Sequence, residues 1–209
     1  PGSAELAIQN DHGVDTLNML KALSEYMNPD FLTHDSNATN AEFRANNVAL
    51  MNMWGSRAAT MVEVDGVSQE VKDGFAIAGP MTVGSGDTSA ATLWWDGFSI
   101  AKNISDSEAE ASFIAMVHAI RPEMITDETE VQAVWLIDGY KPTPAAMGVF
   151  DAAGRKTEPY PSLPQQPLLH SALGNELSDF MQGNETAEQA LADITAAYVT
   201  AAKEKGLLN

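Results

Sequence analysis

An aromatic pair followed by a carboxylate is the group in this 209-residue chain best suited to binding chemistry. Trp94 and Trp95 are adjacent, and Asp96 follows them directly. In an extended strand, neighbouring side chains point to opposite faces, so one ring packs while the other is presented. A presented ring covers the apolar C–H face of a sugar, and a carboxylate accepts hydrogen bonds from its hydroxyl groups. These residues suit a sugar-binding edge, whereas composition alone favours the alternative that all the tryptophans serve the core or an interface.

Residues that could support catalysis or hold a metal form no recognisable pattern. No two histidines have the spacing of a metal-ligand pair. The four are His12, His34, His118 and His170. The Gly84-Ser85-Gly86 turn lacks the lysine of a phosphate-binding loop, and no serine stands in a nucleophile-elbow context. We therefore expect no enzyme, no cofactor and no metal, and a small α/β enzyme using Asp96 is the least favoured alternative.

The composition excludes several classes of partner. Lysine and arginine number 11 against 29 aspartate and glutamate residues, which gives a net charge of −18. Such a surface repels phosphate backbones, so we expect no nucleic-acid binding, and anionic membranes require basic clusters that this chain lacks. No apolar run approaches the ~18 residues of a membrane span. The absence of cysteine removes disulfides, thiolate metal sites and thiol nucleophiles.

Hydrophobic periodicity predicts helices that alternate with short apolar strands, which is typical of an α/β fold. Only about three strands are visible where a sheet typically holds ~5, so we expect part of the fold to lie outside this chain. Loops are expected over 34–40 and 65–74, and Ser56 is expected to cap a helix through Met61. The predicted helices cover 14–27, 105–120, 123–137, 166–182 and 186–205, and the predicted strands cover 48–51, 75–80 and 92–101.

The clearest local signal is a helix start at Ser105. Ser105 and Glu108 have the spacing of a capping box, in which each side chain bonds the other residue's backbone N–H. Apolar residues then recur at helical spacing and predict a buried face. This face consists of Ala109, Phe113, Met116, Val117 and Ile120.

Five segments, in this order, carry a resemblance to a known family. They are 43–58, which contains Trp54-Gly55-Ser56-Arg57; 75–80 followed by 92–103, which contains Trp94-Trp95-Asp96-Gly97; the helix at 105–120; the turn Asp138-Gly139-Tyr140 that continues to 144; and the last two helices. In this order they resemble the family 1 extracellular solute-binding proteins of ABC importers, the maltose-binding-protein-like family. The chain is similar to the C-terminal half of these proteins.

The resemblance implies a periplasmic-binding-protein type II-like α/β fold. Residues 1–76 would form the first part of the C-terminal lobe. Residues 77–122 would hold a hinge strand and a return into the N-terminal lobe, and residues 123–209 would close the C-terminal lobe with helices. The chain begins Pro1-Gly2-Ser3 without a signal-peptide pattern, so we expect a processed or trimmed start.

The resemblance also implies a function. The chain would be the solute-binding component of an ABC importer, in the periplasm or outside the cell. It would bind a sugar, oligosaccharide or polyol and present it to the permease membrane subunits. The implied solute-binding residues are Trp54, Arg57, Trp94, Trp95, Asp96, Tyr140 and His170.

The resemblance departs from this chain at two points. Arg57 stands where the family carries a sugar-stacking tryptophan, which favours a more polar or anionic solute. The family's first half has no counterpart here. The alternative function is therefore a truncated fragment that acts as a structural or interaction piece without solute affinity. We expect such a fragment to retain its missing N-terminal half as a partner or to self-associate.

Overall fold

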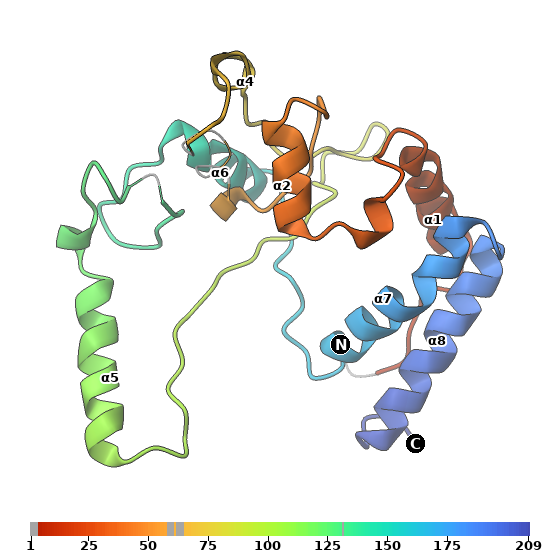
Figure 1. Ribbon diagram of the computed structural model, residues 1–209. Coiled ribbons are helices and arrows are strands. Elements are labelled where there is room, and N and C mark those ends of the chain that lie inside the picture. Colours follow the sequence, from red (N-terminus) through yellow and green to blue (C-terminus); the bar gives the residue numbers. More distant parts are fainter. Residues whose placement is uncertain (1–3, 58–60, 62–64, 131) are drawn as a thin grey trace. The chain divides into compact units, whose positions relative to one another are not determined.

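A computed structural model describes residues 4–57, 61, 65–130 and 132–209 of the chain. It divides into two compact units. Unit 1 combines two distant stretches, Pro1–His34 and Pro161–Asn209, and unit 2 is the continuous stretch Asp35–Tyr160. Figure 1 shows the two stretches of unit 1 in red and blue and most of unit 2 in orange to teal.

Unit 1 is built from helices at both ends of the chain. They are α1 (Asp11–Ser24), the short 3₁₀ helix η1 (Phe31–Thr33), α7 (Gln166–Gln182) and α8 (Ala187–Glu204). A tight turn joins α7 to α8: Gly183 has a φ of 84°, which suits glycine, and the Thr186 hydroxyl then accepts a hydrogen bond from the Gln189 backbone N–H. In Figure 1, α7 and α8 lie side by side, with α1 near the end where they join.

Two buried clusters stabilise unit 1. In the first, Leu17 of α1 packs with Phe180 of α7 and Leu191 of α8. In the second, Ile194 and Tyr198 of α8 are 0% exposed and pack with apolar residues of α7. Burying one such side chain contributes about 1.5–3 kcal/mol relative to leaving it exposed. The core of unit 1 therefore comes from one face of each helix.

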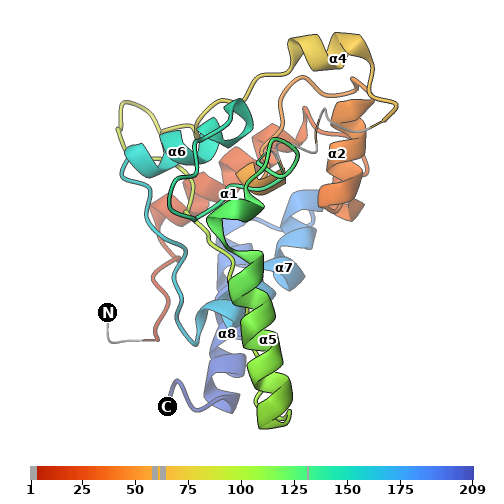
Figure 2. The same ribbon diagram turned by 90° about the vertical axis from the view of Figure 1, so that its left-hand side faces the viewer.

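Unit 2 has shorter helices and longer irregular connections. Its α-helices are α2 (Ser36–Arg44), α4 (Gln69–Gly74), α5 (Asp106–Ala119) and α6 (Met147–Gly154), and its 3₁₀ helices are η2 (Gly55–Arg57), η3 (Pro122–Met124) and η4 (Pro144–Ala146). Figure 1 and Figure 2 show α5 away from α2, α4 and α6, next to an extended stretch of chain.

The irregular segments of unit 2 pack closely on α6. A Cβ atom on Gly55 would lie 2.1 Å from Cγ2 of Val149, and one on Gly148 would lie 2.7 Å from Cγ2 of Ile77. Real Cβ atoms do not approach other atoms this closely, so both contacts require glycine. The helix α6 therefore serves as the support on which the turn at Gly55 and the segment around Ile77 rest.

The predicted α/β fold is wrong. Among the described residues, extended segments meet only at two isolated bridges, Thr82 with Ser89 and Leu93 with Pro159, and no sheet forms. The same finding overturns the expected periplasmic-binding-protein type II-like arrangement. A strand requires a neighbour's backbone along its length. The apolar run at 75–80 instead packs on α6, and proline at its end has no N–H for a ladder.

The helix predictions have mixed outcomes. The helices expected near 14–27, 105–120, 166–182 and 186–205 are confirmed as α1, α5, α7 and α8. The helix expected at 123–137 is wrong, because that segment holds only the end of η3 and turns in its described part.

The two expected loops contain helices, each with a side-chain cap. The loop expected at 34–40 contains the start of α2, whose cap is Asp35: its carboxylate accepts hydrogen bonds from the N–H groups of Asn37 and Ala38 at 2.9 and 2.8 Å. The loop expected at 65–74 contains α4, and the Ser68 hydroxyl caps it. The helix expected from Ser56 through Met61 lies mostly outside the described residues, and its start is η2.

The expected boundaries near residues 76 and 122 remain a prediction.

No helix in the described part of the chain is long and apolar enough to cross a bilayer.

Candidate functional site

A stacked pair of aromatic rings forms the best-defined candidate site, in unit 2. The ring centroids of Trp94 and Tyr160 lie 3.6 Å apart, with 24° between the ring planes. The Trp94 indole N–H also donates a hydrogen bond to the Thr92 hydroxyl at 2.8 Å. Trp94 nevertheless stays 50% exposed. The stack therefore orients an indole ring without burying it.

Backbone hydrogen bonds bring the two rings together. The Leu93 N–H donates to the Glu158 carbonyl at 2.9 Å, and the Tyr160 N–H donates to the Leu93 carbonyl at 2.8 Å. These two bonds form the parallel bridge between Leu93 and Pro159. Trp94 directly follows Leu93, and Tyr160 directly follows Pro159. The bridge therefore fixes the backbone positions from which the two rings extend.

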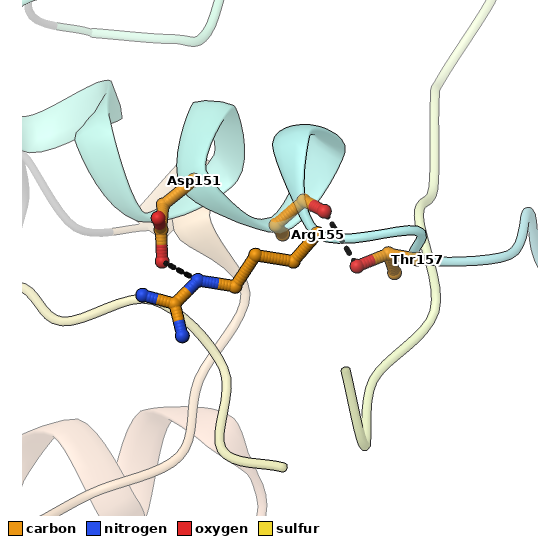
Figure 3. A network of polar contacts seen from close by, with 4 residues as sticks. Asp151, Arg155 and Thr157 are labelled. Atoms are coloured by element: carbon orange, nitrogen blue, oxygen red, sulfur yellow. Dashed lines mark hydrogen bonds and ion pairs between the residues drawn. The ribbon is translucent and has the colours of Figure 1, made fainter. Parts of the chain in front are cut away.

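Two polar contacts at the end of α6 lie just before the Tyr160 side of the bridge, and Figure 3 shows them. Arg155 forms an ion pair with Asp151, with 2.8 Å between Nε and Oδ2. The buried Thr157 hydroxyl donates a hydrogen bond to the Ala152 carbonyl at 2.6 Å. The ion pair spans the last turn of α6, and the Thr157 hydrogen bond folds the following segment back onto the helix, which positions the chain that leads to Tyr160.

A second set of contacts ties this segment to the chain that leads to Trp94. The Ser89 N–H donates to the Arg155 carbonyl at 3.4 Å, and Lys156 forms an ion pair with Asp87. The polypeptide on either side of the stack is therefore held at several points, whereas the rings themselves remain accessible.

Trp95 and Asp96 continue from the stack into solvent. Trp95 is 61% exposed and Asp96 is also exposed. A large apolar ring and a carboxylate thus follow an oriented, half-exposed indole. Their chemistry suits a neutral solute that offers C–H groups to an aromatic face and hydroxyl donors to a carboxylate.

Trp54 and Arg57 form a separate group at the η2 turn. Trp54 is 55% exposed, and its carbonyl accepts a hydrogen bond from the Arg57 N–H at 2.9 Å. The Arg57 guanidinium donates to the Asn37 side-chain oxygen of α2 at 2.8 Å. This turn rests on Val149 near the start of α6, whereas the aromatic stack is anchored beyond the end of α6.

The remaining two expected site residues lie in other surroundings. Tyr140 is half-buried beside Phe150 of α6, with 6.5 Å between ring centroids, and its hydroxyl donates to the Ala133 carbonyl at 3.4 Å. His170 is an exposed residue of α7 and belongs to unit 1, whereas the other six belong to unit 2.

Tyr160 is the residue of the site that the sequence reasoning missed. It stands between Pro159 and Pro161, in a stretch for which the sequence predicts no helix, strand or site residue. A signal was present: an aromatic residue between two prolines has a restricted backbone, which suits a fixed ring. The sequence could not show that Trp94 is its partner.

No group of His, Asp or Glu side chains that could hold a metal ion occurs among the described residues. The polar groups at the stack are hydroxyls, backbone groups and one carboxylate, so the site offers stacking and hydrogen bonds. No protein-family model matches the chain, and no curated protein matches it in sequence.

Proposed function

We propose that this chain binds a neutral carbohydrate-type solute, a sugar, oligosaccharide or polyol, on the surface formed by Trp94, Trp95 and Asp96. The observation that carries the proposal is the half-exposed Trp94 ring, stacked on Tyr160. In this function the chain serves as the solute-binding component of an ABC-type importer, in the periplasm or outside the cell, and presents its solute to the permease membrane subunits. That wider setting rests on the resemblance of its sequence segments.

An aromatic ring that is already oriented supports binding, because its side chain loses less rotamer entropy when a solute binds. A mobile exposed side chain loses rotamer entropy when a ligand fixes it. The stack with Tyr160 and the hydrogen bond to Thr92 restrict the Trp94 ring before any solute arrives. A sugar that covers the exposed part of the ring then gains apolar contact at a smaller entropic cost.

The charge distribution favours a neutral solute at this surface. Asp96 is a hydrogen-bond acceptor and repels anions, and the chain as a whole carries a net charge of −18. The cation among the expected site residues, Arg57, lies at the η2 turn and already donates a hydrogen bond to Asn37. Arg57 is therefore not needed to explain solute binding at the stack.

The test is calorimetric titration of the full chain with glucose, maltose and sorbitol. We expect saturable binding of at least one of them. Trp94→Ala should weaken it about tenfold, since an aromatic contact contributes up to about 1.5 kcal/mol beyond its area. Asp96→Asn should weaken it less, because the amide oxygen can still accept one hydrogen bond.

Three further variants separate binding from folding. Tyr160→Phe keeps the stacked ring and should retain affinity, whereas Tyr160→Ala should lose it along with the orientation of Trp94. Leu136→Ala removes a more exposed apolar side chain elsewhere in unit 2 and should change nothing. If none of the three solutes gives saturable heat up to about 10 mM, the proposal fails, and the chain is better described as an interaction piece without solute affinity.

A further inference from the structure

Four aspartates in this chain are followed directly by glycine. They are Asp65, Asp73, Asp96 and Asp138. In an Asp-Gly pair the backbone nitrogen of the glycine is able to attack the carboxyl carbon of the aspartate, because glycine has no Cβ to hinder the approach and adopts a wide range of backbone angles. Asp96 belongs to the candidate site, and the surroundings of the four pairs differ.

The pair Asp96-Gly97 lies in a stretch of open, irregular chain. Every residue from 94 to 99 is exposed, and the backbone from 94 to 100 forms no helix, ladder or turn. Within the described part of the molecule, no hydrogen bond involves residues 95–100. A Cβ atom added to Gly97 would have nothing within 4 Å. The carboxyl carbon of Asp96 and the nitrogen of Gly97 are therefore free to approach each other.

The chain is held on one side of this pair and not on the other. Before it, Leu93 is fixed by the bridge to the segment at Pro159. After it, the chain runs extended towards α5, as Figure 1 shows. No residue of α5 is buried among the described residues, so the buried face predicted for this helix is wrong: Phe113 is 59% exposed and Val117 is 42% exposed. The segment after Asp96 is therefore not tied to a buried helix.

The pair Asp73-Gly74 offers the closest comparison, because both pairs are followed by phenylalanine. Asp73-Gly74 lies within α4, where helical hydrogen bonds fix the backbone angles. The Asp73 carboxylate also accepts a hydrogen bond from the Gln69 side-chain N–H at 2.7 Å. The same three residues are thus constrained in α4 and unconstrained at the candidate site.

The other two pairs lie in turns. The turn at Asp138-Gly139 is closed by a hydrogen bond from the Tyr140 N–H to the Ile137 carbonyl at 3.1 Å. Asp65-Gly66 also forms a turn, and the two glycines have φ values of 85° and 88°. Defined turn angles oppose the rotation that brings a carboxyl carbon onto the following nitrogen.

We propose that Asp96-Gly97 is a site of spontaneous modification, at which Asp96 converts to isoaspartate through a cyclic succinimide. The Gly97 nitrogen bonds to the Asp96 carboxyl carbon, and the carboxyl hydroxyl leaves with the proton of that nitrogen as water. Water then adds to one of the two ring carbonyls. Cleavage of nitrogen from the side-chain carbon restores aspartate, whereas cleavage from the main-chain carbonyl carbon gives isoaspartate. Mass and charge are unchanged, and solvent water is the reactant that completes the conversion.

Isoaspartate changes the candidate site because the main chain then runs through the former side chain of Asp96. The backbone gains a carbon atom directly after Trp95, and the free carboxylate stands on Cα itself. The carboxylate is thereby displaced relative to the Trp94 ring. We expect loss of solute affinity, a consequence that rests on the proposed function, whereas the modification itself does not.

Peptide mapping of the full chain during storage in neutral buffer at physiological temperature tests the modification. Electron-transfer fragmentation distinguishes isoaspartate from aspartate in each peptide. Isoaspartate at Asp96 should accumulate at least about tenfold faster than at Asp73, because ring closure at Asp73 first requires local opening of α4. Equal rates at the two positions, or no isoaspartate at Asp96, would overturn the proposal.

The unfolded chain separates the effect of the fold from that of the sequence. In guanidinium chloride, the rates at Asp73 and Asp96 should converge, since both aspartates precede Gly-Phe and neither backbone is then constrained. If Asp96 stays as much faster as in the folded chain, the open segment is not the cause and the proposal fails.

Three variants test the chemistry. Gly97→Ala should slow the conversion about tenfold or more, because the new methyl group hinders attack by the nitrogen, and Asp96→Glu should abolish it, because a larger ring must close. Gly74→Ala is the matched control: its Cβ also meets nothing within 4 Å, and it should leave the rate at Asp96 unchanged. Circular dichroism should show the same helix content for the Gly97→Ala and Asp96→Glu chains as for the wild type. Unchanged conversion in Gly97→Ala contradicts the succinimide route.

Calorimetric titration of the stored chain with glucose, maltose and sorbitol reports on the consequence. The binding-competent fraction of the wild-type chain should fall in step with isoaspartate at Asp96, and Gly97→Ala should retain it. If isoaspartate forms while binding persists, the modification stands and Asp96 has no part in binding. If the fresh chain binds none of the three, the proposed function fails, and the peptide map still decides the modification.

Discussion

The two units of this molecule differ in the large side chains that they bury and expose. In unit 1, Leu17, Ile194 and Tyr198 are at most 4% exposed and pack between helices. In unit 2, Trp54, Trp94 and Trp95 are each at least 50% exposed. Unit 1 therefore holds two buried apolar clusters, whereas unit 2 exposes three of the four tryptophans.

This difference separates the side chains that stabilise the fold from those that are accessible to a ligand. An apolar side chain contributes most to folding when it is buried, and most to a ligand contact when it is accessible but oriented. The described part of unit 2 orients its rings through a bridge, a stack and polar contacts at the end of α6. Because its support consists of close backbone contacts, unit 2 should be sensitive to added atoms rather than to lost ones.

The largest effect is expected for Ile194→Ala in unit 1. The side chain is fully buried, so its loss leaves a cavity and should lower the free energy of unfolding of unit 1 by about 3 kcal/mol. Urea denaturation followed by circular dichroism measures it. All four tryptophans lie in Asp35–Tyr160, so tryptophan fluorescence reports on unit 2 and should shift less.

The control for this variant is Ile114→Ala on α5, where the side chain is 61% exposed. It should change the free energy of unfolding by no more than about 0.5 kcal/mol. Equal shifts of both signals in Ile194→Ala would show that the two units unfold as one, which would break the comparison.

A smaller loss is expected for Gly55→Ala in unit 2. The new methyl group would meet Val149, and the turn or α6 must move, which should destabilise unit 2 by about 1–3 kcal/mol. The shift should be larger in fluorescence than in circular dichroism. Gly97→Ala, where nothing lies within 4 Å of the added atom, is the control. An unchanged fluorescence transition in Gly55→Ala would contradict the close packing on α6.

A glycine-to-alanine substitution at Gly174 should instead stabilise unit 1. This residue lies within α7, and a Cβ there would have nothing within 4 Å. Alanine restricts the unfolded chain and suits a helix, so Gly174→Ala should raise the free energy of unfolding of unit 1 by about 0.5–1 kcal/mol. Thermal unfolding followed by circular dichroism checks the sign, and a lower midpoint would show that α7 tolerates no added methyl group.

The smallest effect concerns two glutamates beside the start of α8. Partial loss of hydration, with the negative charges of Asp193 and Asp179, raises the pKa of Glu185. Folded Glu185 therefore holds its proton more tightly than the unfolded chain does, and its contribution to stability improves as the pH falls from the raised pKa towards the ordinary one. Hydrogen bonds from its own backbone N–H and from the Thr186 side chain lower the pKa of Glu188. Its contribution is present above the ordinary pKa and is lost as the pH falls through the lowered one.

Carboxyl NMR titration of both residues tests these directions. The titration midpoint of Glu185 should lie above the ordinary range for glutamate, and that of Glu188 should lie below it. Asp193→Asn should bring the midpoint of Glu185 down towards the ordinary range. If both midpoints lie on the same side of the ordinary range, the charges around Glu185 are not arranged as described.

Local signals in the sequence predicted α1, α5, α7 and α8. The capping box at Ser105 correctly marks the start of α5, because a cap depends on residues only three positions apart. Asp35 and Ser68 are caps of the same chemical kind, yet α2 and α4 were taken for loops since no strong apolar periodicity follows them. The caps alone were informative there.

Long-range features could not be predicted in this way. The apolar run at 75–80 satisfies the strand pattern, but whether it pairs with another strand or rests on a helix depends on residues some 70 positions away, such as Gly148. The stack of Trp94 with Tyr160 is hidden for the same reason. The sequence indicated one ring of the candidate site, and the pairing that orients it required the folded chain.

The division of unit 1 between the two ends of the chain has a consequence for synthesis. Leu17 leaves the ribosome long before Tyr198, and at ~5–20 residues per second the interval is on the order of ten seconds or more. Throughout this interval α1 lacks the helices that cover it, while all of Asp35–Tyr160 emerges and can fold. The nascent chain thus completes unit 2 before unit 1, and a ribosome that stalls ahead of α8 releases a product whose α1 lacks Leu191 and the other α8 residues that pack in the cluster with Leu17.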